Sequence, residues 1–261
     1  MITSNSGLTV VNENFSAVLS HTKPSRVILS VPHDGLIAND FSGLFQERKN
    51  GWKGRDLYVW PIANEVVRQC LQSGMEVDAI RFLMARAYVD ANREMRNDVN
   101  LDLDTLGQTA LNDWRLAGVY QHYHGEIARL LNRSLEVFGA DRILFIDLHG
   151  FGKQPAFAPH EGYDLILGTA NRTTINHGEI DRLFAAFMRD KNYIVFLPTE
   201  KPIVSSGDPY SAGHITRLYA KRYGINTMQI EISPTFRNRE AKELGEKLAA
   251  DIAGFLCANY R

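Results

Sequence analysis

The sequence predicts an α/β protein, a three-layer α/β/α sandwich with a mostly parallel, mixed central sheet. Apolar runs of strand length alternate with segments whose apolar residues recur at helical spacing, which is typical of a parallel sheet covered by helices on both faces. Two of these runs, 26–35 and 142–150, end in the same way, with a histidine, an acid and a glycine. Ligands of such sheets bind at the C-terminal strand edge, so we expect these polar groups to converge there.

The remaining elements follow from the same two patterns. Strands are expected at 27–31, from 75 to 79 onward, and at 142–148, 163–167, 193–197 and 225–232. Apolar stripes at helical spacing predict helices within 59–71, 116–138, 180–188, 215–219 and 244–256. Before residue 26 the chain shows only a polar start, and 34–55 is glycine-rich with little periodicity, as in a long functional loop.

Composition narrows the classes of partner. The chain has 29 basic and 30 acidic residues without a long single-sign run, which argues against nucleic acid and anionic membrane surfaces and favours a small molecule. No apolar stretch approaches a bilayer span and no signal segment is evident at the start, so a cytoplasmic protein is expected. The length and the absence of a linker predict a single domain over 1–261, whereas the oligomeric state stays open.

His33 and His149 are candidate metal ligands. Each follows an apolar run, so in a parallel sheet both imidazoles could reach one crevice and bind a divalent ion. A single histidine in this position is more often structural. Because both histidines follow an apolar run and lie beside an acid and a glycine, the sequence favours the metal-ligand interpretation instead. Zinc is the natural candidate, with another divalent metal as the alternative. Asp56 is the expected third ligand, and Glu47 in the same loop is the second candidate. Either acid could instead be a solvated loop residue, and Asp56 could also be a helix N-cap.

Other polar residues suggest supporting roles. Asp34 and Asp147 neighbour the histidines and are expected to accept hydrogen bonds that orient the imidazoles. Glu231 interrupts an apolar strand, where it could be a general base or, equally, an acid on a solvated edge. Asn92 and Arg93 would suit recognition of a substrate carboxylate, the alternative being a surface arginine paired with a nearby acid.

These motifs, taken in order, resemble the N-formylglutamate amidohydrolase family. The resemblance rests on Val31-Pro32-His33-Asp34-Gly35, Asp56, 88–93, Asp147-Leu148-His149-Gly150, Gly207-Asp208-Pro209 and 229–232, and it spans about 26–235. It implies a fold like that of zinc carboxypeptidases and phosphorylase/hydrolase proteins. It also implies a metal site of His33, Asp56 and His149, a glutamate base at Glu231, and Arg93 with Asn92 for the substrate carboxylate.

The leading hypothesis is a zinc-dependent amidohydrolase that cleaves an N-acyl amino acid such as N-formylglutamate with metal-activated water. One alternative is a peptidase or deacylase acting on a different acyl substrate. Another is a non-catalytic protein that binds a metal or a carboxylate. The sequence leaves the acyl group, the amino acid, the metal and the metabolic pathway open.

Overall fold

The computed structural model describes residues 2–3, 8–38, 43–95, 109–154, 160–198 and 210–261. Within these ranges nine strands form one sheet in the order β1-β2-β3-β5-β4-β6-β9-β7-β8. The strands are β1 Ile2–Thr3, β2 Leu8–Glu13, β3 Ser16–His21, β4 Val27–Val31, β5 Val77–Phe82, β6 Leu144–Gly150, β7 Leu165–Gly168, β8 Val195–Phe196 and β9 Asn226–Ile232. The helices are α1 Val59–Gln72, α2 Ala117–Phe138, α3 Ile180–Asp190, α4 His214–Tyr223 and α5 Lys242–Tyr260, with short 3₁₀ turns η1 Trp114–Leu116, η2 Ala140–Arg142 and η3 Pro234–Phe236.

The sheet is mixed, with a parallel centre. Strands β5, β4, β6 and β9 run parallel to one another, and β7 and β8 are parallel to each other but antiparallel to β9. The predicted α/β fold with a mostly parallel, mixed sheet is confirmed. The interpretation of the chain before residue 26 as only a polar start was wrong. Residues 8–21 form the antiparallel pair β2–β3, and β3 joins this pair to the rest of the sheet through β5. Asn14 and Phe15 turn the chain between these strands with positive φ angles of 42° and 63°.

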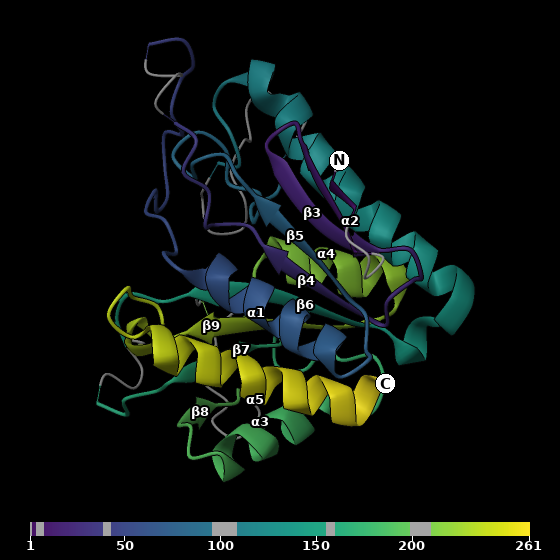
Figure 1. Cartoon of the computed structure of the whole chain (residues 1–261). Helices are drawn as coiled ribbons and strands as arrows, with labels where there is room; N and C mark the ends of the chain where they lie inside the picture. Colours follow the sequence, from purple (N-terminus) through teal and green to yellow (C-terminus); the bar gives the residue numbers. More distant parts are fainter. Residues whose placement is uncertain (1, 4–7, 39–42, 96–108, 155–159, 199–209) are drawn as a thin grey trace.

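Helices cover both faces of the sheet (Figure 1). One core packs α1, α3 and α5 against Leu29, Ile146 and Ile230 of the central strands. The second core packs α2 and α4 against Ile28 and Phe145. Because side chains alternate along a strand, each central strand supplies both cores, which is why these strands are nearly continuous apolar runs.

The same alternation determines where the polar residues of β6 and β9 lie. Ile146 and Leu148 belong to the α1/α3/α5 core and Phe145 to the opposite core, so Asp147 and His149 lie on the α2/α4 face. Glu231 is the register partner of His149 in the neighbouring strand and therefore lies on the same face. The C-terminal ends of β6 and β9 thus present an imidazole and a carboxylate side by side.

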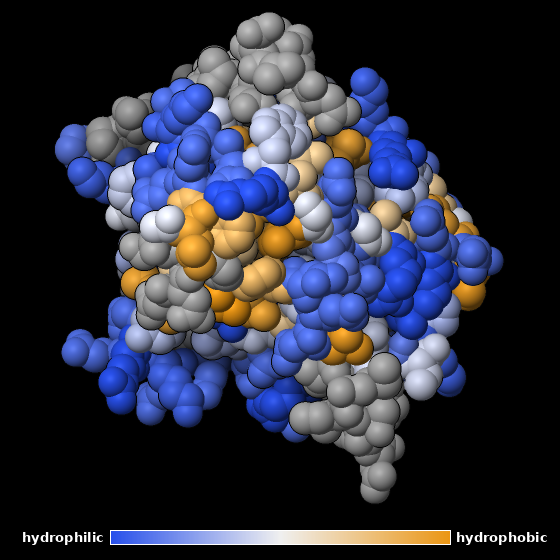
Figure 2. All heavy atoms as spheres, turned by 90° about the horizontal axis from the view of Figure 1, so that it is seen from above, coloured by the Kyte–Doolittle hydropathy of each residue, from blue (hydrophilic) through white to orange (hydrophobic). Residues whose placement is uncertain are grey.

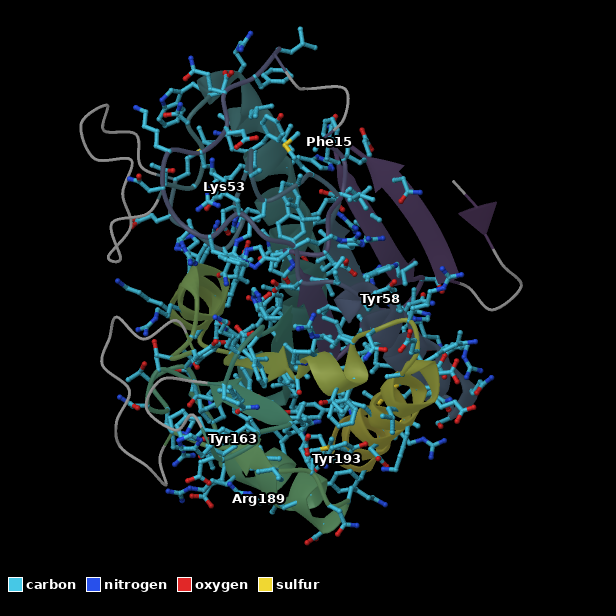
Figure 3. All side chains as sticks on the ribbon, turned by 90° about the vertical axis from the view of Figure 1, so that its left-hand side faces the viewer. Phe15, Lys53, Tyr58, Tyr163, Arg189 and Tyr193 are labelled. Atoms are coloured by element: carbon cyan, nitrogen blue, oxygen red, sulfur yellow. The ribbon has the colours of Figure 1, made fainter. Side chains whose placement is uncertain are left out.

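The outer surface mixes polar and apolar residues. Seen from above, hydrophobic side chains gather in patches between hydrophilic ones (Figure 2). Figure 3 shows Phe15, in the β2–β3 turn, and Tyr193, just before β8, towards opposite ends of the molecule. None of the described helices has both the length and the apolar character needed to cross a bilayer.

Candidate functional site

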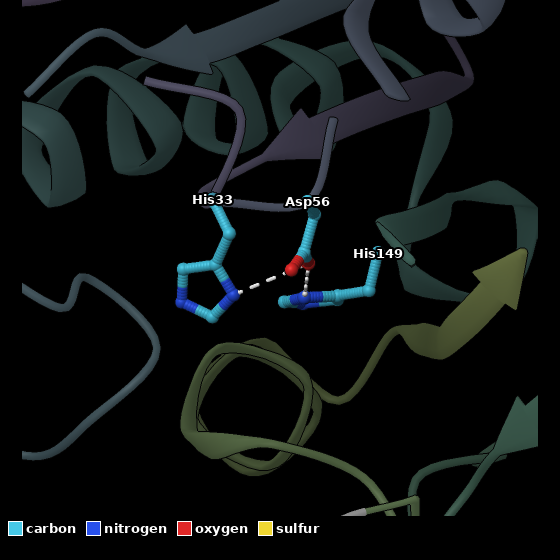
Figure 4. A group of neighbouring side chains, drawn as sticks. All are labelled: His33, Asp56 and His149. Atoms are coloured by element: carbon cyan, nitrogen blue, oxygen red, sulfur yellow. Dashed lines mark hydrogen bonds and ion pairs between the residues drawn. The ribbon is translucent and has the colours of Figure 1, made fainter. Parts of the chain in front are cut away.

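Three predicted ligands meet at the C-terminal edge of the sheet (Figure 4). His33 follows β4, His149 is the penultimate residue of β6, and Asp56 lies three residues before α1. One ligand atom from each lies within 4.8 Å of the others. Asp56 Oδ2 is 3.3 Å from His149 Nδ1 and 3.5 Å from His33 Nδ1. The structure therefore brings together three residues that are widely separated in the chain.

Backbone contacts hold Asp56 between the two histidines. The Asp56 amide donates to the carbonyl of His33 at 2.9 Å, and the Gly150 amide donates to Asp56 Oδ2 at 3.2 Å. The loop that begins at His33 thus returns to its own starting point. This closure explains how an acid 23 positions after His33 reaches the same edge of the sheet.

A carboxylate contacts the far nitrogen of each imidazole. His149 Nε2 lies 2.9 Å from Asp147 Oδ2, and His33 Nε2 lies 2.6 Å from Asp90 Oδ1. In the neutral rings, a proton on each Nε2 would donate to these acids, which leaves the Nδ1 lone pairs directed towards the space beside Asp56. The pairs therefore favour the same tautomer in both rings and present two nitrogen ligands to one point.

The site carries an excess of buried acids. Burial alone would raise the pKa of the Asp56 carboxyl, but hydrogen bonds and positive charge from His149 and His33 outweigh it and lower that pKa. Burial likewise opposes protonation of His149, yet the charge and hydrogen bond of Asp147, reinforced by Asp56, raise the pKa of this imidazole to about 10. The two shifts are the two sides of one attraction, because the imidazoles stabilise the ionised carboxylate of Asp56 and the carboxylates stabilise a positive charge on His149.

Glu231 completes the polar edge. Its side chain is buried, and Gln229 Nε2 donates to Glu231 Oε1 at 2.8 Å. Burial raises the pKa of Glu231 to about 7; His149 opposes the rise and Asp56 adds to it. Glu231 therefore faces the polar cleft rather than a solvated strand edge.

These residues open onto a cleft of about 810 Å³. Asn92 and Arg93 line it and are both buried. Asn92 Nδ2 lies 3.1 Å from His149 Nε2, while Asn92 Oδ1 accepts a hydrogen bond from the amide of Ile215 at 2.9 Å. Arg93 donates from Nη1 to the carbonyl of Asn92 at 2.8 Å. The interpretation of Arg93 as a surface residue is therefore wrong, and its guanidinium lies where it can meet a ligand in the cleft.

Two expectations for acids need correction. Asp34 was expected to orient a histidine, but its carboxylate accepts from Arg55 Nε at 2.6 Å and from the Trp60 amide at 2.7 Å. No hydrogen bond joins Asp34 to a histidine in the part of the chain that the structure describes. Glu47 pairs with Lys53 Nζ at 2.8 Å, and its side chain is 52% exposed. Asp34 thus anchors the start of α1, and Glu47 is a surface acid.

Sequence reasoning missed the group that holds His33. Asp90 is fully buried and also accepts from Arg86 Nε at 2.8 Å, while Arg48 Nη1 lies 3.3 Å from its second oxygen. Arg48, itself buried, also donates to the carbonyls of Thr109 and Arg86. Asp90 could have been found from the sequence, because it is an acid within the apolar run 88–91. The sequence around Arg48 and Arg86 gives no indication that they pair with it. Their roles depend on contacts between distant segments.

Comparison with known proteins adds a family and a fold. Residues 25–236 match the family model described as N-formylglutamate amidohydrolase. No curated protein matches the sequence at a significant level.

Among solved structures, a gene product of Agrobacterium tumefaciens is similar at a TM-score of 0.58 and 16% identity, covering 97% of this chain and 93% of that one. Succinylglutamate desuccinylase from Vibrio cholerae gives a TM-score of 0.52 at 11% identity, covering 100% and 65%. A metallo-carboxypeptidase from Burkholderia cenocepacia gives a TM-score of 0.47 at 12% identity, covering 97% of this chain and 65% of that one. The chain therefore spans 65% of the length of the last two proteins, and the first two likenesses support the fold alone.

Proposed function

Because the chain belongs to the N-formylglutamate amidohydrolase family and is thus a hydrolase of amide bonds, we propose that it cleaves a small N-acyl amino acid, such as N-formylglutamate, with the help of a divalent metal. Zinc is the first candidate. The observation that carries this proposal is the convergence of two imidazole Nδ1 atoms and the Asp56 carboxylate beside Glu231. We infer that His33, Asp56 and His149 would hold the metal.

The donor set fits such an ion. Two imidazole nitrogens and one carboxylate oxygen are a common set of protein ligands in catalytic zinc sites. His33 Nδ1 is buried, and Asp56 Oδ2 at 3.5 Å is too distant for a strong hydrogen bond, which is costly unless another group binds this nitrogen. Bound there, a divalent ion would supply a Lewis acid that polarises the amide carbonyl and acidifies a water molecule.

Glu231 is the proposed general base. One of its carboxylate oxygens is held by Gln229, which leaves the other to take a proton from the attacking water. The water oxygen bonds to the acyl carbon, the C–N bond breaks, and Glu231 passes the proton to the departing nitrogen. The products are a carboxylic acid, formic acid for a formyl substrate, and the free amino acid.

Substrate contacts are proposed for other residues that line the same cleft. Arg93 and Asn92 would bind the α-carboxylate of the amino acid, since a guanidinium fork matches a carboxylate in shape and charge. Arg86 lines the same cleft, with Nη1 4.0 Å from Asp56 Oδ1. Its fixed positive charge would offset the negative charge that develops on the carbonyl oxygen.

Metal content and a substrate panel test the proposal together. Wild-type protein should contain about one zinc per chain after loosely bound ions are removed, and His149→Ala should lose it. His177→Ala is the matched control, because His177 contacts the carbonyl of Gly224 at 2.7 Å, away from the site. Failure of the wild type to hold a metal, even after zinc is offered, would contradict the proposal.

The panel should contain formyl, acetyl and short-peptide amides of the same amino acid. Release of formate from the formyl compound would support the proposed substrate. Faster cleavage of the acetyl or peptide compounds would indicate a deacylase or peptidase. Metal binding without turnover of any compound would indicate a non-catalytic binding protein.

A further inference from the structure

Arg237 is a buried cation next to the proposed site, with only 8% of its surface exposed. All of its guanidinium nitrogens donate to backbone carbonyl groups. Nε donates to Ile232 at 2.8 Å, Nη1 to Leu57 at 2.7 Å and Nη2 to Phe151 at 2.8 Å. Arg237 is not among the described residues that line the cleft, so the proposed chemistry gives it no contact with a substrate.

The three carbonyl groups belong to the three segments that carry the proposed chemistry. Each stands one or two positions after a residue to which we give a part in the reaction, namely Asp56 before Leu57, His149 before Phe151 and Glu231 before Ile232. Two of these segments are the ends of the neighbouring strands β6 and β9, and the third is the loop before α1. Arg237 therefore joins the loop backbone to both strand ends through one rigid, planar group.

Local structure delivers the guanidinium to this place. The Arg237 amide donates to the carbonyl of Pro234 at 3.1 Å, which closes the turn η3, and Phe236 packs into the α1/α3/α5 core. The turn thus brings the side chain back towards the end of β9. Gly150 leaves the space that the guanidinium fills, because a Cβ there would lie 2.1 Å from Arg237 Cζ. Packing and hydrogen bonds therefore fix the same position.

The charge of Arg237 is balanced by the residues that it helps to hold. Burial lowers the pKa of Arg237, and the negative charges of Asp56 and Glu231, followed by that of Asp34, oppose this fall. A buried guanidinium is costly without such compensation. A lysine ammonium would keep the charge but could not match three carbonyl groups with one planar fork. The site therefore favours an arginine at this position.

We propose that Arg237 is a positioning residue, which fixes the proposed metal ligands Asp56 and His149 relative to the proposed base Glu231. This inference rests on the proposed function and deepens it. Arg237 acts through the backbone and touches neither the substrate nor the reacting atoms. Without its fork, the loop that carries Asp56 is free to shift relative to the two strand ends. A displacement of about 1 Å between reacting groups can cost about 100-fold in rate.

Arg237→Lys tests the fork separately from the charge. We expect kcat for N-formylglutamate, expressed per bound metal, to fall roughly 10- to 100-fold. KM should stay within about 2-fold, because the proposed substrate contacts of Arg93 and Asn92 do not involve Arg237. Both constants are measured well below the unfolding temperature of the variant. If Arg237→Lys does not fold, Arg237→Gln removes the buried charge, keeps part of the hydrogen bonding and should show the same division between kcat and KM.

Arg133→Lys is the matched control. Arg133 also donates to a backbone carbonyl, that of His21, at 2.7 Å, and to Asp78 Oδ2 at 2.7 Å. Asp78 is the second residue of β5, at the strand end opposite to the proposed site. This variant should lower Tm but leave kcat per bound metal unchanged. If Arg237→Lys also changed only Tm, its role would be purely structural. A rise in KM with unchanged kcat would place Arg237 in substrate binding, and either result would overturn the inference.

Cobalt binding separates this inference from the proposed function. Metal-free wild type, Arg237→Lys and Arg133→Lys are titrated with Co²⁺ in the absence of substrate, and the visible absorption of the ion reports the geometry of its ligands. A roughly 10-fold or greater loss of affinity and an altered spectrum in Arg237→Lys alone would support the positioning role, even if N-formylglutamate is not hydrolysed. Identical affinity and spectra in wild type and Arg237→Lys would overturn it, even if hydrolysis is found. Failure of the wild type to bind cobalt would contradict the proposed function and the inference together.

Discussion

His149 of β6 and Glu231 of β9 are register partners in adjacent parallel strands, and both side chains lie on the face covered by α4. The sheet therefore sets the distance between a proposed metal ligand and the proposed base, and no loop has to fold to bring them together. Sites on regular elements hold their geometry more closely than sites on loops. The following predictions depend on this arrangement.

Glu231→Gln should abolish proton transfer but keep the site intact. The amide has nearly the same shape as the acid and still contacts Gln229, but it cannot accept a proton at neutral pH. We expect kcat for an N-acyl amino acid to fall by a factor on the order of 10² to 10⁴ while metal content stays at the wild-type level. Steady-state kinetics and elemental analysis measure both. Glu179→Gln, an exposed acid at the start of α3, is the control, and full activity in Glu231→Gln would exclude this residue as the base.

Asp147→Asn should weaken metal binding. Asp147 Oδ2 contacts His149 Nε2, and loss of its charge reduces the basicity of the ring as a ligand. Such substitutions typically lower metal affinity about 10- to 100-fold, which competition with a chelator can measure. Asp34→Asn is the informative control, because Asp34 contacts Arg55 and the Trp60 amide and should leave the affinity unchanged. Equal effects of the two variants would contradict the roles that the structure gives these acids.

His124 should make the protein less stable in mild acid. Its Nδ1 contacts the Tyr219 hydroxyl at 2.8 Å and its Nε2 contacts the Ala91 carbonyl at 3.0 Å, while the His214 ring centroid lies 5.9 Å away. Burial, followed by the charge of His214, lowers the pKa of His124 to about 3 from an ordinary value of 6.5. Tyr120 and Tyr123 are the other titratable groups against the ring.

The sign follows from where the proton binds. Below pH 6.5 the unfolded chain binds a proton at His124, whereas the folded protein does not bind it until the pH approaches 3. The full free energy of unfolding is therefore present above pH 6.5, and this contribution is lost as the pH falls towards 3. Between pH 7 and pH 5 this amounts to about 2 kcal/mol in the free energy of unfolding. Urea unfolding at both pH values should show that the free energy of unfolding of His124→Gln lacks this contribution to the pH dependence. If His122→Gln, on the same helix, lost it equally, the effect could not be assigned to His124.

Gly150→Ala should destabilise the fold next to the site. A Cβ at Gly150 would lie 2.1 Å from Arg237 Cζ. That guanidinium cannot move away easily, because it donates to the carbonyls of Ile232, Leu57 and Phe151. We expect a loss of roughly 1–3 kcal/mol in the free energy of unfolding, typical of overpacking. Gly152→Ala is the control, since its Cβ would meet nothing within 4 Å, and equal stability of the two variants would contradict the steric account.

The local periodicity of the chain was enough to predict the central strands, the helices and the positions of His33 and His149. A buried parallel strand has to be apolar on both faces, so an imidazole at its end stands out against the pattern. The N-terminal strands escaped notice because polar residues break their apolar runs. β2 pairs with β3, and β3 pairs with β5, so contacts between distant segments hold them in the sheet.

The roles of the surrounding acids were decided by the tertiary structure. Asp34 is next to His33 in the chain but extends to Arg55, whereas Asp90, 57 positions away, contacts the ring. The side chains of these two neighbours are directed to different partners, so closeness in sequence gives no contact between them. By itself the sequence determined which residue types reach the sheet edge, because strand periodicity is local. Which carboxylate binds which nitrogen, and which arginine reaches the cleft, depends on packing between distant segments, and only the folded chain decides it.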